Sequence, residues 1–129
     1  MTELNQKVEQ YDLREHVVFL GRRNDIPDLL KMIDILIIPS AFEGFPLAGL
    51  AAAAGVPVIA CDAAGAEEFI RVSRDGVTFA EDDVDSAADA VGKILEGKEQ
   101  YKKAGIEFAS QMSNREYSTK IEQIFKSIE

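Results

Sequence analysis

Four short apolar runs alternate along the chain with stretches whose apolar residues recur at helical spacing. The runs cover residues 17–20, 35–38, 56–60 and 77–79. They are continuously apolar rather than strictly alternating, which is typical of strands covered on both faces, as in parallel sheets. The pattern therefore predicts an α/β domain with about four parallel strands.

Helices are predicted between and after these runs. Caps and apolar spacing indicate helices over about 2–13, 25–33, 46–54 and 66–70. From residue 83 onward the sequence is helical throughout, with a stop at Gly97 and a last capped helix from Ser113. We expect residues 1–129 to form a single α/β domain of three layers.

Composition and charge narrow the class of partner. The formal net charge of −9 argues against a nucleic-acid partner, whose phosphates need a basic face. No apolar run approaches the ~20 residues that span a bilayer, and the polar first dozen residues lack a signal-peptide core, so we predict a cytoplasmic protein without a membrane span. With one cysteine and one histidine in the chain, we expect no metal and no cofactor.

The loop from Pro39 to Leu47, after the second apolar run, is the first candidate site. In open α/β sheets ligands bind beyond the carboxyl ends of the strands, where a loop that leads into a helix offers unpaired N–H groups. The amides of Gly44, Phe45 and Leu47 could hold a diphosphate, and Glu43 could accept hydrogen bonds from sugar hydroxyls. Pro46 suits the first helical turn. An ordinary turn with a solvated glutamate is the alternative interpretation.

Two further loops carry charged residues, and for both we favour an ordinary structural role. Glu67 and Glu68 open a predicted helix, where the helix dipole favours acids in any case. Arg22 and Arg23 follow the first apolar run and could contact phosphate. Neither a GxxxxGK[ST] loop nor a GxGxxG fingerprint occurs in the sequence. Cys61 closes a buried run and is interpreted as an inert thiol.

The order of these signals resembles the C-terminal domain of retaining GT-B glycosyltransferases of glycosyltransferase family 4. The matching segments are 17–21, 34–40, 43–47, 55–60, Gly65 with Glu68, and 75–76, between about His16 and Glu96. The resemblance implies a Rossmann-like domain that binds a nucleotide-diphosphate sugar, while a separate N-terminal domain binds the acceptor. It implies no catalytic side chain here, but it does imply donor-binding residues: Ser40, Glu43, Gly44, Phe45, Pro46, Leu47 and Gly65.

Departures from the family pattern predict that the isolated chain is inactive. Ala51 stands where the family has a second glutamate that binds the ribose, and residues 43–55 are one residue shorter than usual, which turns the later part of the helix by ~100°. The acceptor domain and the βαβ unit that supplies cations to the donor phosphates are not part of this sequence. We expect weak nucleotide-sugar binding at best. The alternative is a non-catalytic interaction module or an engineered fragment that retains only the fold.

The resemblance also bears on the order of the strands. In the family order 3-2-1-4-5-6, two strands that this chain lacks separate the strand like 17–20 from the strand like 35–38. Either the run 17–20 moves beside 35–38, or partner chains complete the sheet in a homo-oligomer. A simple sequential order with right-handed crossovers would place the connecting helices on one face. The C-terminal helices, or a second subunit, would then cover the other face.

Overall fold

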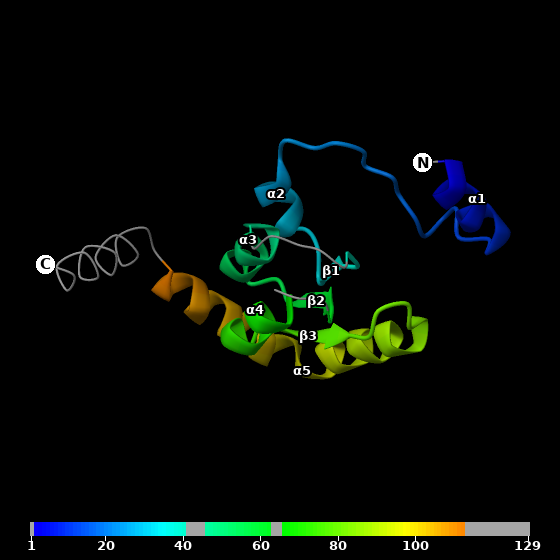
Figure 1. Ribbon diagram of the computed structural model, residues 1–129. Coiled ribbons are helices and arrows are strands. Elements are labelled where there is room, and N and C mark those ends of the chain that lie inside the picture. Colours follow the sequence, from blue (N-terminus) through cyan, green and yellow to red (C-terminus); the bar gives the residue numbers. More distant parts are fainter. Residues whose placement is uncertain (1, 41–45, 63–65, 113–129) are drawn as a thin grey trace, which may run out of the picture.

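The computed structural model describes residues 2–40, 46–62 and 66–112 (Figure 1). Within them, three strands form a parallel sheet in the order β1-β2-β3: β1 (Leu36–Ile38), β2 (Val58–Cys61) and β3 (Gly76–Phe79). Ile37 lies opposite Ile59, which lies opposite Val77. The predicted α/β, Rossmann-like class with parallel strands is confirmed.

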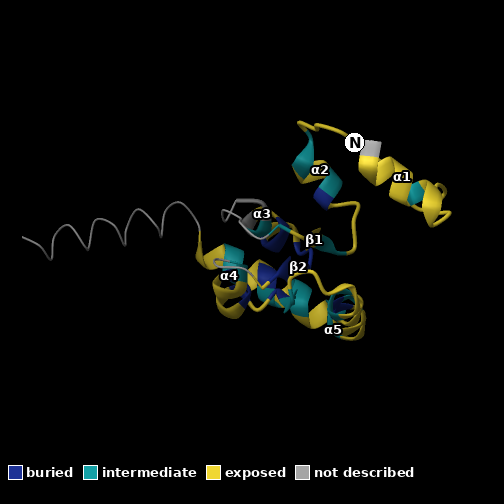
Figure 2. Ribbon diagram, turned by 45° about the vertical axis from the view of Figure 1, so that its right-hand side comes forward, coloured by how far each residue is buried: buried dark blue, intermediate teal, exposed yellow. Residues whose placement is uncertain are grey.

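The helices of the described residues are α1 (Thr2–Gln10), α2 (Ile26–Leu30), α3 (Pro46–Ala54), α4 (Ala66–Ser73) and α5 (Val84–Gln111). Each begins where the sequence pattern places a helix start. In both overall views α1 lies apart from the sheet, joined to α2 by an extended arm (Figures 1 and 2). Among these helices, none is long and apolar enough to cross a membrane.

Residues that alternate along β2 face two separate apolar layers. Val58 and Ala60 pack with residues of α3 and α4 on one face of the sheet. Ile59 packs on the other face against Ala90 and Ile94 of α5. The buried residues therefore concentrate at the sheet and at the helix faces turned toward it (Figure 2). This arrangement has three layers, and the part of α5 before Gly97 covers the face opposite α3 and α4.

Helix α5 consists of two helical segments joined at Gly97. The backbone there is not helical, with φ −112° and ψ 19°, in agreement with the predicted stop. After the kink the helix runs along α3 and α4, where the rings of Phe108 and Phe69 meet edge to face with centroids 5.6 Å apart. Lys98, just past the kink, donates a hydrogen bond to Asp34, ahead of β1. The last predicted helix, from Ser113, lies outside the described residues.

The strand predicted at 17–20 is absent from the structure, and that prediction was wrong. These residues are irregular, and Val18 and Leu20 are 78% and 54% exposed. The described sheet therefore has three strands rather than four, with β1 at its edge. An apolar run forms a strand only when a neighbouring strand pairs with it, because β-propensity largely measures the packing of side chains against neighbouring strands. The structure does not place the run 17–20 beside β1.

Candidate functional site

The carboxyl ends of the three strands lie along one edge of the sheet. Because both pairings are parallel, Ser40 follows β1, Asp62 follows β2 and residues 80–83 follow β3 at this same edge. Helices α3 and α4 begin after β1 and β2, so their N-termini lie there too. Helix N-termini offer unpaired N–H groups and a positive dipole end. This edge is where ligands of open α/β sheets bind.

Three of the predicted donor-binding residues belong to the described chain. Ser40 is half-buried, two residues beyond the end of β1. Pro46 and Leu47 form the start of α3. The other four lie outside the described residues: Glu43, Gly44, Phe45 and Gly65. The structure thus brings the first three to the interval between β1 and α3, and the donor-binding role of all seven stays a prediction.

Hydrogen bonds hold the loop after β3 to the end of β2. The Asp62 amide donates to the Phe79 carbonyl oxygen at 2.8 Å, and the Glu81 amide donates to Asp62 Oδ1 at 3.2 Å. Asp83 caps α5 by accepting from the Ser86 amide at 2.9 Å. Sequence reasoning missed Asp62 as a positioning residue. The only signal was its place directly after a buried run, which does not reveal its partner 19 positions away.

The described part of this edge is negatively charged. Burial raises the pKa of the Cys61 thiol, and the carboxylates of Asp62, Glu81 and Asp82 raise it further. The same carboxylates would oppose a diphosphate at the carboxyl ends of β2 and β3. Cys61 therefore stays a protonated, buried thiol, in agreement with the inert role predicted for it.

Two charged residues of the further candidate loops, Arg23 and Glu68, have local partners. Arg23 donates both arms of its guanidinium to Asp25, at 2.8 and 2.5 Å, which raises the pKa of Arg23 and lowers that of Asp25. A bidentate phosphate contact would need this same fork. Glu67 and Glu68 are exposed in the first turn of α4, with a Glu68 oxygen 3.8 Å from an Arg71 nitrogen. These contacts support the ordinary structural roles.

Position 51, where the family pattern has its second glutamate, faces the core in α3. Ala51 is fully buried, so a carboxylate placed there would face apolar side chains rather than a ligand. Leu50, one residue earlier, is 47% exposed. One helical residue corresponds to a rotation of ~100°, which accounts for the change of face. In α3, position 50 is therefore open to solvent and position 51 is not.

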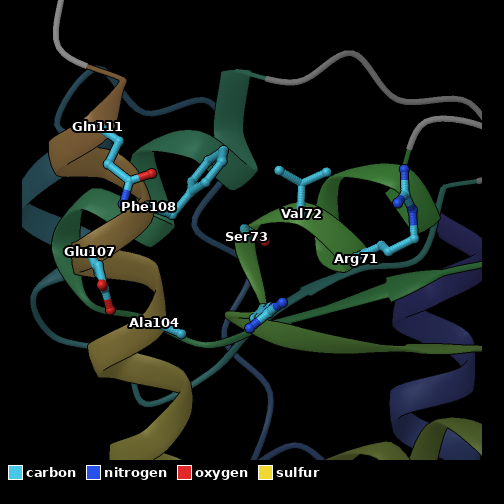
Figure 3. A pocket seen from close by; sticks show the side chains of 8 residues that line it. Arg71, Val72, Ser73, Ala104, Glu107, Phe108 and Gln111 are labelled. Carbon is cyan, nitrogen blue, oxygen red and sulfur yellow. The ribbon is translucent and has the colours of Figure 1, made fainter.

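A pocket of about 400 Å³ lies between α4 and the second segment of α5 (Figure 3). Its walls are formed by Arg71, Val72, Ser73, Arg74, Ala104, Glu107, Phe108 and Gln111. Ser73 and Arg74 come immediately before the start of β3, so the pocket lies at the sheet edge opposite the carboxyl ends. It is therefore separate from the candidate donor site.

Comparison with known proteins settles the family. The model of the family described as Glycosyl transferases group 1 matches residues 2–111 of the chain. The chain belongs to this family.

This group 1 glycosyltransferase domain has relatives with named activities. It is 31% identical over 100 residues to the lipopolysaccharide core biosynthesis mannosyltransferase LpsB of Rhizobium meliloti, covering 75% of this chain and 28% of that protein. It is 35% identical over 88 residues to the UDP-Gal:alpha-D-GlcNAc-diphosphoundecaprenol alpha-1,3-galactosyltransferase of Escherichia coli, covering 67% and 23%. The match thus spans about a quarter of the length of these relatives.

Solved glycosyltransferase structures share the fold of this group 1 domain. Sucrose-phosphate synthase of Thermosynechococcus elongatus aligns over 98% of this chain and 34% of its own, with a TM-score of 0.81 at 23% identity. Anabaena HepE, solved in complex with UDP-glucose, aligns over 98% and 36%, with a TM-score of 0.79 at 25% identity. The C-terminal domain of LpcC from Francisella tularensis aligns over 85% and 60%, with a TM-score of 0.68 at 29% identity.

Proposed function

We propose that this chain is the nucleotide-sugar-binding part of a retaining GT-B glycosyltransferase of family 4. The proposed donor site is the edge of the sheet where β1 leads into α3. The observation that carries the proposal is the start of α3 at Pro46, after the loop that begins at the carboxyl end of β1. A helix N-terminus at that edge offers N–H groups that have no partner within the helix.

Different residues bind different parts of the donor. The amides at the start of α3 bind the diphosphate, to which a helix N-terminus contributes about 0.3–1 kcal/mol per charge. Glu43 accepts hydrogen bonds from hydroxyls of the donor sugar. Transfer with retention depends on stabilising the diphosphate leaving group, and helix amides supply donors for the charge that develops on it.

Binding by this chain alone is expected to be weak. The carboxylates of Asp62, Glu81 and Asp82 gather at the same edge. Charges within a Debye length of about 8 Å still act on a ligand at physiological salt. The position eight residues after Glu43 is buried in the core and supplies no ribose contact. We therefore expect a Kd of about 1 mM or weaker, which corresponds to about −4 kcal/mol.

We further propose that this stretch of sequence is not sufficient for sugar transfer. It corresponds to 28% and 23% of the two relatives named above, and the transferase names belong to those longer proteins. The cytoplasmic location and the homo-oligomeric state expected from the sequence belong to the same proposal. Cell fractionation and analytical ultracentrifugation test them.

A uridine-diphosphate sugar is the first donor to test, because HepE has been solved with UDP and with UDP-glucose. The chain is titrated by NMR with UDP-glucose and separately with UDP. Glu43→Gln should weaken binding of UDP-glucose but leave binding of UDP unchanged, because only the glucose offers hydroxyls to Glu43. Glu99→Gln, which removes an equal charge from an exposed site on α5, is the matched control. If Glu43→Gln weakened binding of UDP-glucose and of UDP equally, this would contradict the proposal that Glu43 binds the sugar hydroxyls.

A non-catalytic interaction module is the second candidate. The burial of Ala51 and the acidic carboxyl edge favour it, since both work against a nucleotide ligand. Absence of saturable binding by UDP, UDP-glucose, GDP and GDP-mannose would decide for this alternative. Saturable binding by any one of them would decide against it.

A further inference from the structure

Asp75 is a fully buried carboxyl group in the turn between α4 and β3. Its backbone oxygen accepts a hydrogen bond from the Val58 amide at 3.0 Å, which fixes the residue at the start of the sheet. Its Oδ1 lies 2.5 Å from the Ser73 hydroxyl oxygen. Its Oδ2 is buried and has no hydrogen-bond partner among the described residues. One carboxyl oxygen is thus bonded and the other is not.

The Ser73 hydroxyl has one proton, and the structure gives that proton another acceptor. Ser73 Oγ donates to the Phe69 carbonyl oxygen at 2.8 Å, the back-bond that serine makes to the residue four positions earlier in a helix. A hydroxyl donates only once, so the Ser73 proton goes either to Phe69 or to Asp75. When it goes to Phe69, the Ser73 oxygen is an acceptor for Asp75, and the proton between them belongs to Asp75.

We propose that Asp75 is a neutral carboxylic acid in the folded domain, and that its ionisation at higher pH loosens the second segment of α5 from α3. As an acid, Asp75 donates through Oδ1 to Ser73 and leaves only a neutral carbonyl oxygen at Oδ2. As a carboxylate, it would place charge on a buried oxygen that has no donor. An unpaired buried charge costs far more than an unpaired carbonyl.

Among the residues that the structure describes, no charged side chain forms an ion pair or a hydrogen bond with Asp75. Helix α3 contains no ionisable residue. The ionisable residues nearest in sequence to the contact are Arg74, exposed just after α4, and Lys103 and Glu107, both exposed on α5. Burial raises the pKa of Asp75, and it outweighs the lowering that a hydrogen bond donated by Ser73 to the ionised carboxylate gives.

Asp75 packs against Gly105 of α5, so the protonation state of Asp75 affects how α5 packs. A Cβ atom at Gly105 would stand 3.0 Å from the Asp75 Cβ and 3.2 Å from the Ala52 Cα. Helix α5 therefore seals Asp75 from solvent, and moving this segment outward would hydrate an ionised carboxylate. Ser73 also lines the pocket between α4 and α5, so the proton lies one hydrogen bond from the pocket wall (Figure 3).

The sign of the pH dependence is set by the raised pKa. The stabilising contribution of Asp75 is complete below the ordinary carboxyl pKa of 3.8 and is lost as the pH rises through the pKa of the folded state. Asp75→Asn has the shape of the neutral acid, and its amide can donate to Ser73 in the same way. That variant should keep the fold and lose this pH dependence.

The test uses the full chain and two measurements. The first follows the Asp75 side-chain carboxyl carbon by NMR as the pH is raised, and the expected titration midpoint lies above 3.8. A midpoint at or below that value overturns the proposal, and this measurement needs no variant.

The second measurement compares amide exchange of residues 98–111 in the wild type and in Asp75→Asn at matched pH. Faster exchange in the wild type at mildly alkaline pH, with equal exchange at acidic pH, is the expected result. Asp85→Asn, at an exposed position in the first turn of α5, should behave as the wild type. Equal exchange in the wild type and Asp75→Asn at every pH would overturn the coupling to α5.

Discussion

Gly105 of α5 lies against the backbone of Ala52 of α3, so closely that a Cβ atom at position 105 would stand 3.2 Å from both the Ala52 Cα and its carbonyl oxygen. The start of α3 forms one side of the candidate donor site. This contact therefore connects the last described helix to the element that carries the site.

Gly105→Ala should destabilise the domain by about 1–3 kcal/mol, the usual cost of overpacking a well-packed contact. The gain in helix propensity would not compensate, because the added methyl group meets backbone atoms. Denaturant unfolding measures the change. Gly92→Ala in the same helix is the matched control, since nothing lies within 4 Å of its Cβ position. There the substitution should stabilise by about 0.5–1 kcal/mol, and equal effects at the two positions would contradict this packing.

Glutamate at positions 50 and 51 should have opposite consequences. Ala51→Glu places an unpaired carboxylate in the core, and we expect a loss of about 3–5 kcal/mol in the free energy of unfolding. Leu50→Glu changes a side chain that is 47% exposed, and we expect a change of about 0.5 kcal/mol or less. Thermal unfolding of the two variants distinguishes the helix faces. Tolerance of Ala51→Glu would mean that the register of α3 differs from that described.

The run at 17–20 should show no strand-like protection in solution. Amides that are unpaired exchange rapidly, whereas those in a core strand are protected up to the global stability. Hydrogen exchange detected by NMR should therefore show fast exchange at Val18 and Phe19 and slow exchange at Ile59. Protection that increases with protein concentration would instead support strand exchange between chains, and protection at all concentrations would contradict the described sheet.

The sequence predicted strands correctly where another strand of the same chain pairs with them. The runs that became β1, β2 and β3 were recognised from continuous apolar residues, and Gly97 marked the kink of α5. The run at 17–20 has the same apolar character, but no strand of the described sheet pairs with it, and composition does not record the availability of a partner.

For the site, local chemistry was predictable and tertiary contacts were not. Pro46 indicated the start of α3 because its preference for a first turn is intrinsic. The bond of Asp62 to the loop after β3 depends on contacts between distant segments. The burial of Asp75 depends on such contacts too, since α5 packs over a residue that lies between α4 and β3.

The contact between Asp34 and Lys98 should stabilise the domain only above acidic pH. The hydrogen bond and charge of Lys98 hold the pKa of Asp34 below its ordinary value of 3.8. A lowered pKa gives stability that is present above the unfolded value and lost as the pH falls through the folded value. Asp34→Asn should therefore flatten the acid side of the stability profile, measured by thermal unfolding. Asp89→Asn, at an exposed position on α5, should keep the wild-type profile; a flattened profile in both variants would contradict a specific role for Lys98.

Donor binding at the carboxyl edge between β1 and α3 is tested most directly by NMR mapping of the labelled chain during addition of UDP-glucose. We predict shifts that grow with ligand concentration at the amides of Ser40, Leu47 and Asp62, while those of Val72 and Ala104 at the opposite pocket stay unchanged. Shifts confined to that pocket, or none at any concentration, would contradict donor binding at this edge.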